Sequence, residues 1–248
     1  MRSRAEATPS FVWVESLGDP GSTIALPRDE SHYVARVCRA RAGDAISLTD
    51  GRGGLATARV VKPAPPVVVE ILEVQAAPAR GGTSWLLCGA PEGRRDDWLV
   101  EKLAELGVAV FQPIDAARSS WGTAAGRIER WERLATAALR QSRRRYRLEV
   151  RAPVPLEAAV AALPAGAGRW VADPSGRPAG EFRPDPTLAI GAVGPAEGFD
   201  PREVSHLMDQ GFRPIALSDG RLRAETAAVA WAAWWSAGRI GASEARAS

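Results

Sequence analysis

The chain has 248 residues, of which 46% are hydrophobic and 25% charged, close to the averages of soluble globular proteins. A chain of this length can form one large or two modest domains with a buried core, and it needs neither a disulfide nor a metal to fold. It contains no apolar run of about 18 residues, and its first ten residues have no apolar stretch. We therefore expect a cytoplasmic protein without a signal peptide or a membrane span.

The few cysteines and histidines argue against a metal site or a disulfide framework. There are two cysteines, Cys38 and Cys88, both in apolar segments, and two histidines, His32 and His206. The net charge is only +3, but lysine occurs just twice, so nearly every cation is an arginine. Arginine suits bidentate phosphate contact and stacking on bases, although a GC-rich coding sequence also produces arginine-rich proteins.

The first third of the chain predicts a small β-barrel. Short apolar runs separated by Gly and Pro predict strands at residues 11–14, 45–49, 55–61 and 67–74, with a turn at 50–54. A helical piece at 29–39 would place Val34, Val37 and Cys38 on one face. The turn-forming residues 77–82 are expected to be a linker, which makes residues 1–76 the first domain.

Beyond the linker, residues 83–248 alternate between strand and helix, which predicts an α/β domain with a parallel sheet. The predicted strands are 84–90, 108–112, 169–172, 187–193 and 212–217. The predicted helices are 95–106 with Gly107 as its stop, 127–142, 155–163, a helix that starts at Asp200-Pro201 with Glu203 in a capping box, and 224–237.

Two glycine-containing loops follow predicted strands of this sheet. Residues 191–199 follow one strand, and residues 217–227 follow another. The carboxyl ends of parallel strands lie at one edge of a sheet, where open α/β sheets bind ligands. We therefore interpret the loops as two sides of a binding site, although each taken alone could be a plain tight turn.

Two further clusters of side chains suggest contacts with partners. Residues 140–147 are rich in arginine and include Tyr146, which favours an RNA-phosphate patch, although a solvated helix end is the alternative. Trp231, Trp234 and Trp235 lie within five residues, and we interpret them as core or subunit interface. Because they cannot share one narrow stripe, we expect a monomer to leave at least one of these rings in water, which favours a symmetric dimer.

The order of motifs along the chain resembles the RsmE-type uridine N3-methyltransferases of bacterial 16S ribosomal RNA, which belong to the SPOUT class. The similarity is nearly end to end and rests on the segments 32–39, 43–44, 50–51, 101–107, 118–119, 141–144, 194–198 and 222–227. The resemblance implies a PUA-like RNA-binding barrel and a SPOUT α/β domain tied in a deep trefoil knot. It also implies a homodimer, S-adenosyl-L-methionine as cofactor, and 16S ribosomal RNA or the small ribosomal subunit as substrate.

The resemblance, together with the chemistry of methyl transfer to a uridine N3 that must lose its proton, suggests roles for individual residues. Arg223 would stabilise the uracil oxyanion, and Glu225 would orient the base or accept its proton, unless Glu225 only caps the helix. The implied cofactor-binding residues are Gly194, Pro195, Gly198, Leu217, Gly220, Leu222 and Thr226. The implied RNA-binding residues are Arg36, Arg39, Arg118, Arg143, Arg144 and Arg147. No metal is implied.

The sequence departs from the family in both loops. The family usually has Gly-Pro-Glu-Gly-Gly where this chain has Gly194-Pro195-Ala196-Glu197-Gly198, and Ser218 and Gly220 replace a glycine and an arginine of the last loop. Arg221 lies beside the missing arginine. Two alternatives stay open: a SPOUT enzyme that methylates a ribose 2′-hydroxyl, and a non-catalytic RNA-binding protein that has kept the fold.

Overall fold

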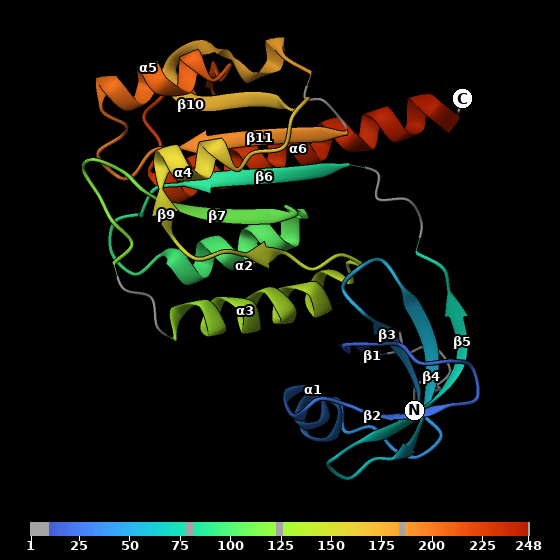
Figure 1. Cartoon of the computed structure of the whole chain (residues 1–248). Coiled ribbons are helices and arrows are strands. Elements are labelled where there is room, and N and C mark those ends of the chain that lie inside the picture. Colours follow the sequence, from blue (N-terminus) through green and yellow to red (C-terminus); the bar gives the residue numbers. More distant parts are fainter. Residues whose placement is uncertain (1–9, 78–81, 123–125, 184–186, 248) are drawn as a thin grey trace. The chain divides into compact units, whose positions relative to one another are not determined.

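The computed structural model describes residues 10–77, 82–122, 126–183 and 187–247, with side chains through Arg239 (Figure 1). The chain forms two compact units. The first contains the described residues up to Ala77 together with Leu139–Arg147, and the second contains Gly82 to Ala138 and the chain from Leu148 onward. Most of the predicted linker, 77–82, lies outside the described residues.

The first unit is a curved five-stranded sheet with an apolar core (Figure 1). Its strands are β1 (Ser10–Trp13), β2 (Thr23–Ala25), β3 (Ala45–Thr49), β4 (Leu55–Lys62) and β5 (Val68–Gln75), in the order β1-β3-β4-β5-β2. β1 pairs with β3 in parallel, and the other pairs are antiparallel. Alternate residues such as Ile46, Leu48 and Ile71 are buried in the core, as the strand period requires.

The helical piece predicted at 29–39 is α1 (Arg28–His32) followed by the π-helical turn η2 (Tyr33–Val37). Val34 is fully buried, but Val37 is 65% exposed, so the prediction that these two residues share one face is wrong. The reason is local. The Cys38 amide donates to the Tyr33 carbonyl five residues earlier, which widens the turn and shifts the following side chains off the α-helical period.

The segment Leu139–Arg147 is joined to the sheet of the first unit. The Gly53 amide donates to the Arg145 carbonyl at 2.9 Å, and the Arg147 amide donates to the Gly51 carbonyl at 2.8 Å. A Cβ at Gly53 would lie 2.5 Å from the Tyr146 hydroxyl, so this close approach requires glycine, whose φ is +110°. The predicted 50–54 turn therefore also receives a segment from far along the chain.

The second unit contains a parallel sheet in the order β12-β10-β11-β6-β7-β8. The strands, in chain order, are β6 (Thr83–Cys88), β7 (Val110–Asp115), β8 (Glu149–Val150), β9 (Val154–Pro155), β10 (Gly168–Pro178), β11 (Leu188–Val193) and β12 (Arg213–Ala216). β9 also pairs with β7. The short strands β8 and β9 were not predicted, because two residues carry no periodic signal.

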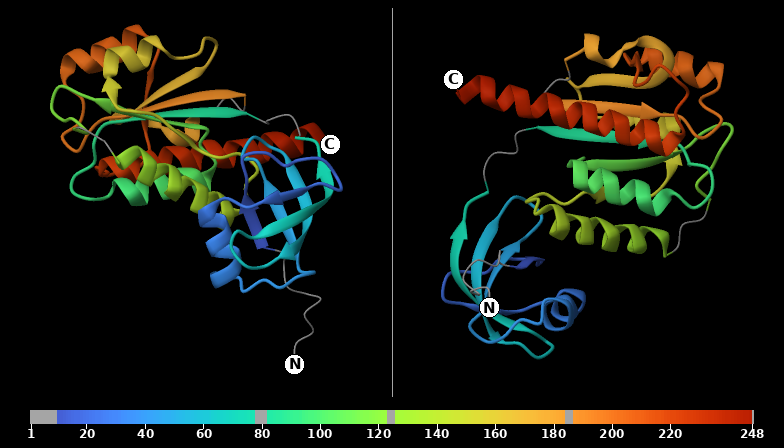
Figure 2. Two further views of the ribbon diagram at one scale, coloured as in Figure 1. Left: turned by 60° about the horizontal axis from the view of Figure 1, so that its bottom comes forward. Right: turned by 180° about the vertical axis from the view of Figure 1, so that it is seen from behind.

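Helices cover both faces of this sheet (Figures 1 and 2). One core contains side chains of α2 (Asp96–Leu106), α3 (Arg127–Ser142) and α6 (Ala224–Ala247). The other contains side chains of α4 (Leu156–Ala161) and α5 (Pro201–Asp209). Neighbouring residues of β6, Leu86 and Leu87, belong to opposite cores. Burial on both faces explains why these strands are continuous apolar runs in the sequence.

The predicted helix ends agree closely with the structure. Gly107 ends α2 in the left-handed conformation with φ +80°. Asp200 accepts the Glu203 amide while the Glu203 side chain accepts the Asp200 amide, which is the predicted capping box. Within the described residues, no helix combines the length and the apolar character needed to cross a membrane.

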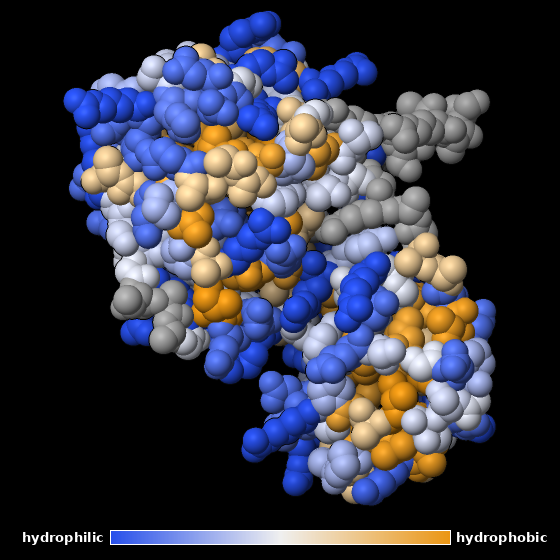
Figure 3. Space-filling view, viewed as in Figure 1, coloured by the Kyte–Doolittle hydropathy of each residue, from blue (hydrophilic) through white to orange (hydrophobic). Residues whose placement is uncertain are grey.

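The tryptophans of α6 do not support the expected exposed ring. Trp231 and Trp235 are fully buried within one chain. Trp234 is half-buried, stacks edge-on against Trp170 at 5.3 Å, and donates from Nε1 to the Ala179 carbonyl at 3.0 Å. The sheet and the segment after β10 cover these rings, so the expectation that a monomer leaves one of them in water is wrong, and the rings give no argument for a dimer. The exposed apolar side chains include Val61, Leu72 and Val74 of β4 and β5, where Figure 3 shows hydrophobic surface.

Candidate functional site

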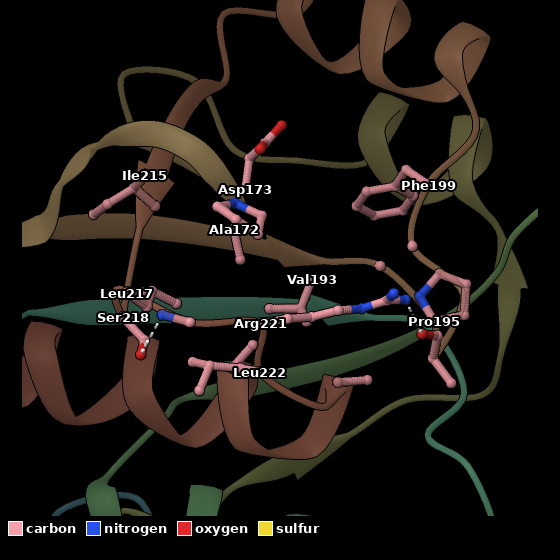
Figure 4. A pocket seen from close by; sticks show the side chains of 17 residues that line it. Ala172, Asp173, Val193, Pro195, Phe199, Ile215, Leu217, Ser218, Arg221 and Leu222 are labelled. Atoms are coloured by element: carbon pink, nitrogen blue, oxygen red, sulfur yellow. Dashed lines mark hydrogen bonds between the residues drawn. The ribbon is translucent and has the colours of Figure 1, made fainter.

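A pocket opens at the carboxyl ends of β11 and β12 and at the middle of β10, the strand between them (Figure 4). Both glycine-containing loops predicted from the sequence contribute to its wall. Its lining residues are Ala172, Asp173, Pro174, Val193, Gly194, Pro195, Ala196, Gly198, Phe199, Ile215, Leu217, Ser218, Gly220, Arg221, Leu222, Ala224 and Ala227. This is the edge at which open α/β sheets bind ligands.

The loop after β11 is tightly folded. Gly198 has φ +79°, and its amide donates to the Pro195 carbonyl at 2.8 Å. A Cβ at Gly194 would lie 2.8 Å from the Phe199 amide nitrogen. Gly194 is therefore required by the turn itself, because a side chain there would collide with the loop backbone.

The loop after β12 carries polar groups and reaches the other loop. The Gly220 amide donates to Ser218 Oγ at 3.2 Å, and Arg221 Nη2 donates to the Ala196 carbonyl at 3.3 Å, across the two loops. α6 begins directly after this loop, and the Ala227 amide donates to the Arg223 carbonyl at 2.8 Å. Arg221, which lies next to the position where the family has an arginine and this chain has Gly220, also lines the pocket.

The third side of the pocket was not predicted. β10 bulges between Ala172 and Arg177, which both pair with Ile215, and the bulge brings Asp173 and Pro174 to the pocket. Asp173 Oδ1 accepts the Ser175 amide and hydroxyl at 2.8 Å each. The position of Asp173 directly after the predicted strand 169–172 is the signal that could have identified it, because that strand ends at the same edge.

The chemistry of the lining favours a ligand with both apolar and polar parts. Asp173 and Arg221 are the two charged residues among those that line it, and most of the other side chains are apolar, including Val193, Phe199 and Leu222. An apolar wall with a few convergent polar groups is typical of small-molecule and cofactor sites.

The structure brings most of the predicted cofactor-binding residues together. Six of them line the pocket: Gly194, Pro195, Gly198, Leu217, Gly220 and Leu222. Thr226 is exposed and does not line it. Neither do the two predicted catalytic residues: Arg223 has a 57% exposed side chain, whereas the side chain of Glu225 is 2% exposed and faces Arg95.

The predicted RNA-binding arginines fall into two groups. Arg118 is exposed in the second unit, and its Nη1 donates to the Glu197 carbonyl at 3.4 Å, beside the loop after β11. The others belong to the first unit. Arg36 and Arg39 are exposed on and after η2, Arg144 is half-buried, and the guanidiniums of Arg143 and Arg147 lie 5.3 Å from the ring centres of Phe11 and Trp13 respectively.

Cys88, at the end of β6, is a free and fully buried cysteine. Burial raises the pKa of the Cys88 thiol far above its usual value, and the charge of Glu225 raises it further. Cys88 therefore stays protonated at physiological pH. No group of three or more His, Cys, Asp or Glu side chains suited to a metal ion occurs in the part of the chain that the structure describes.

A parallel α/β sheet with a pocket at its strand ends defines an α/β domain of the kind that binds small ligands at this edge, and the chain adds a small β-sheet domain. Comparison with known families gives the particular assignment. The chain belongs to the RNA methyltransferase family: residues 82–236 match the RNA methyltransferase domain, and residues 26–72 match the RNA methyltransferase PUA domain. It is therefore an RNA methyltransferase with a PUA-like first domain.

Individual relatives agree with this assignment. The ribosomal RNA small subunit methyltransferases E of Synechocystis and Mycobacterium bovis are each 28% identical to this chain; the matches cover 83% and 88% of this chain, and 70% and 88% of those proteins. The crystal structure of ribosomal RNA small subunit methyltransferase E from Neisseria gonorrhoeae bound to S-adenosyl methionine is similar with a TM-score of 0.82 and 26% identity. That match covers 91% of this chain and 96% of the other.

Proposed function

We propose that this RNA methyltransferase transfers the methyl group of S-adenosyl-L-methionine to N3 of a uridine in 16S ribosomal RNA. The observation that carries the proposal is the pocket at the ends of β11 and β12 and at the bulge of β10, which contains six residues expected to hold that cofactor. The names of the relatives support ribosomal RNA of the small subunit as the substrate. Binding of S-adenosyl methionine by the similar Neisseria protein supports the cofactor.

The pocket lining suits S-adenosylmethionine. The apolar side chains of Leu217 and Leu222 would contact the adenine ring, Asp173 would accept hydrogen bonds from hydroxyl or ammonium groups, and the turn at Gly194 would present backbone groups. When bound, the cofactor supplies a methyl group activated by a positive sulfur. Ala196, Ser218 and Gly220, which depart from the family pattern, also line the pocket, so the departures change its surface without removing it.

The residues of the chain contribute mainly by positioning and charge. Methyl transfer forms the N3–CH3 bond, breaks the S–CH3 bond of the cofactor and requires loss of the N3 proton to water. A cation beside the uracil oxygens would favour the anionic base. Arg223, at the start of α6 and largely exposed, is proposed for this role. The burial of Glu225 supports a role in holding the start of α6 rather than in accepting the proton.

Several properties stay predictions. The barrel of residues 1–76, with Arg36, Arg39, Arg143, Arg144 and Arg147, is proposed to bind RNA together with Arg118 of the domain 83–248. A homodimer, a trefoil knot and a cytoplasmic location rest on the resemblance and on the composition. Thr226, exposed on the first turn of α6, remains a proposed cofactor residue only through the resemblance.

Analysis of the modified nucleoside tests the proposal. The protein is incubated with S-adenosylmethionine and with small ribosomal subunits or 16S RNA that lacks the modification, and the RNA is digested and examined by mass spectrometry. N3-methyluridine is the expected product, and Arg223→Met should reduce its formation. A methyl group on the ribose would identify a 2′-O-methyltransferase instead, and binding of RNA without any methylation would favour a non-catalytic protein.

A further inference from the structure

Two segments far apart in the sequence meet through two ion pairs. Arg95 Nη1 lies 2.6 Å from Glu225 Oε1, and Arg223 Nη1 lies 3.5 Å from Glu92 Oε2. Glu92 and Arg95 belong to the segment between β6 and α2, whereas Arg223 and Glu225 lie at the start of α6. The second segment also supplies part of the pocket wall.

The two pairs differ in burial and therefore in strength. The Glu225 side chain is only 2% exposed, while that of its partner Arg95 is 48% exposed. In the other pair, the side chains of Glu92 and Arg223 are 76% and 57% exposed. Exposed ion pairs contribute little to stability and exchange readily. A buried carboxylate, in contrast, is strongly destabilising when its cation is removed.

Arg95 is the ion-pair partner of the buried Glu225 carboxylate. The second oxygen of Glu225, Oε2, is buried and has no hydrogen-bond partner among the described residues. Arg95 immediately precedes α2, and α2 packs against α6. The pair therefore fixes the first turn of α6 to the start of α2.

That first turn forms one wall of the pocket. Leu222, Ala224 and Ala227 line the pocket on either side of Glu225 in the sequence, while Glu225 itself points away from it toward Arg95. A shift of this turn would move the pocket wall and Arg223 together. Displacements of about 1 Å remote from the reacting atoms can reduce catalysis by about 100-fold.

We propose that Arg95 is a positioning residue for methyl transfer: through Glu225 it holds the pocket wall at 222–227, while Arg223 remains free to leave Glu92 and contact the RNA base. This inference rests on the proposed function, because it assigns Arg95 to the same site. Arg95 acts without touching the cofactor or the RNA.

The test compares Arg95→Met with Arg94→Met, which makes the same change at the exposed neighbouring arginine. S-adenosylmethionine affinity is measured by calorimetry without RNA, and kcat and KM are measured with the RNA substrate. We expect Arg95→Met to weaken cofactor binding and lower kcat, each by about tenfold or more, with KM for RNA unchanged. Arg94→Met should behave like the wild type, and Arg95→Lys, which keeps the charge, should recover most of the loss.

Removal of both partners separates positioning through Glu225 from any independent role of Arg95. Arg95→Met/Glu225→Gln buries no unpaired charge, so it should fold even where Arg95→Met does not. Its cofactor affinity and kcat should be no lower than those of Glu225→Gln alone, because the two residues act through one contact. The inference would be overturned if the double variant lost more cofactor affinity and kcat than Glu225→Gln alone. It would also be overturned if Arg95→Met had the same cofactor affinity and kcat as Arg94→Met. A wild-type protein that binds no S-adenosylmethionine would instead overturn the proposed function.

Discussion

Trp231 of α6 lies directly against Gly191 of β11: a Cβ added at Gly191 would be 2.4 Å from Trp231 Cε2. Both residues are buried, and the indole is fully enclosed. The missing side chain at Gly191 thus allows the longest helix of the protein to lie close to the centre of the parallel sheet (Figure 2). The glycine predicted as part of a ligand loop instead serves the packing of α6.

Gly191→Ala should therefore destabilise the protein. The added methyl group must displace a large ring that has no free space, and overpacking of this kind costs about 1–3 kcal/mol. The free energy of unfolding is measured by urea denaturation. Gly180→Ala is the control, because a Cβ at Gly180 meets no atom within 4 Å. Equal stability of the two variants would show that α6 can move away from β11 at little cost.

Asp173 provides a direct test of the pocket. Asp173→Asn keeps the size of the side chain but removes the negative charge that faces the proposed hydroxyl or ammonium groups of the cofactor. We expect S-adenosylmethionine to bind about tenfold more weakly, since a hydrogen bond to a charged group contributes about 1.5–3 kcal/mol. Calorimetry measures the affinity. Asp219→Asn, at an exposed aspartate that does not line the pocket, should leave it unchanged.

The buried ion pair of the first unit predicts a pH-dependent stability. Burial raises the pKa of Glu30 above its usual 4.5, and the charge of Arg140, with which it pairs, opposes this increase. A carboxyl group whose pKa is raised by folding favours the folded state fully below its unfolded pKa, and this contribution is lost as the pH rises through the folded pKa. Removal of Arg140 raises the folded pKa further, so the loss becomes larger and extends to higher pH.

Arg140→Met should consequently be destabilised by about 3–5 kcal/mol at pH 7.5, as expected when one partner of a buried pair is removed, and by less at pH 5. Amide hydrogen exchange in β1 and β3 isolates the stability of the first unit from that of the second. Arg36→Met, at an exposed arginine of the same unit, should show no such pH dependence. A constant destabilisation of Arg140→Met between pH 5 and pH 7.5 would contradict the assignment to Glu30.

Much of the fold could be predicted because its determinants are local. The apolar run at Leu188–Val193 and the capping box at Asp200 each depend on neighbouring residues, and the structure places both where the sequence indicates. The π-helical turn at Tyr33–Val37 could not be predicted, because it is defined by backbone hydrogen bonds rather than by the apolar period. The same limit applies to β8, which exists only through its pairing with β7.

The candidate site was likewise predicted only where its residues lie in a local sequence pattern. Residues in the two loops were found because glycines follow apolar strands, whereas Asp173 was missed because the bulge of β10 has no glycine-rich pattern before it. The partner of Glu225 could not be found from spacing, since Arg95 is 130 residues away. Contacts between residues so far apart in the sequence depend on the order of the strands in the sheet, which cannot be predicted from residue spacing.

The exposed arginines on and just after η2 give a direct test of RNA binding by the first unit. Arg36 is exposed on η2, and Arg39, which has φ +52°, is exposed just after it. Because both side chains are exposed, their replacement removes charge without opening the core. If both contact phosphates, Arg36→Ala/Arg39→Ala should weaken RNA binding and reduce the slope of log affinity against log salt by about 0.7–0.9 for each contact.

The slope is obtained from filter-binding or fluorescence titrations at several salt concentrations. Arg177→Ala, which removes an exposed arginine paired with Glu181 in the second unit, serves as the matched loss of one charge and should leave the slope unchanged. An unaltered slope in the double variant would place the RNA-binding surface elsewhere, while S-adenosylmethionine affinity should be the same in all three proteins.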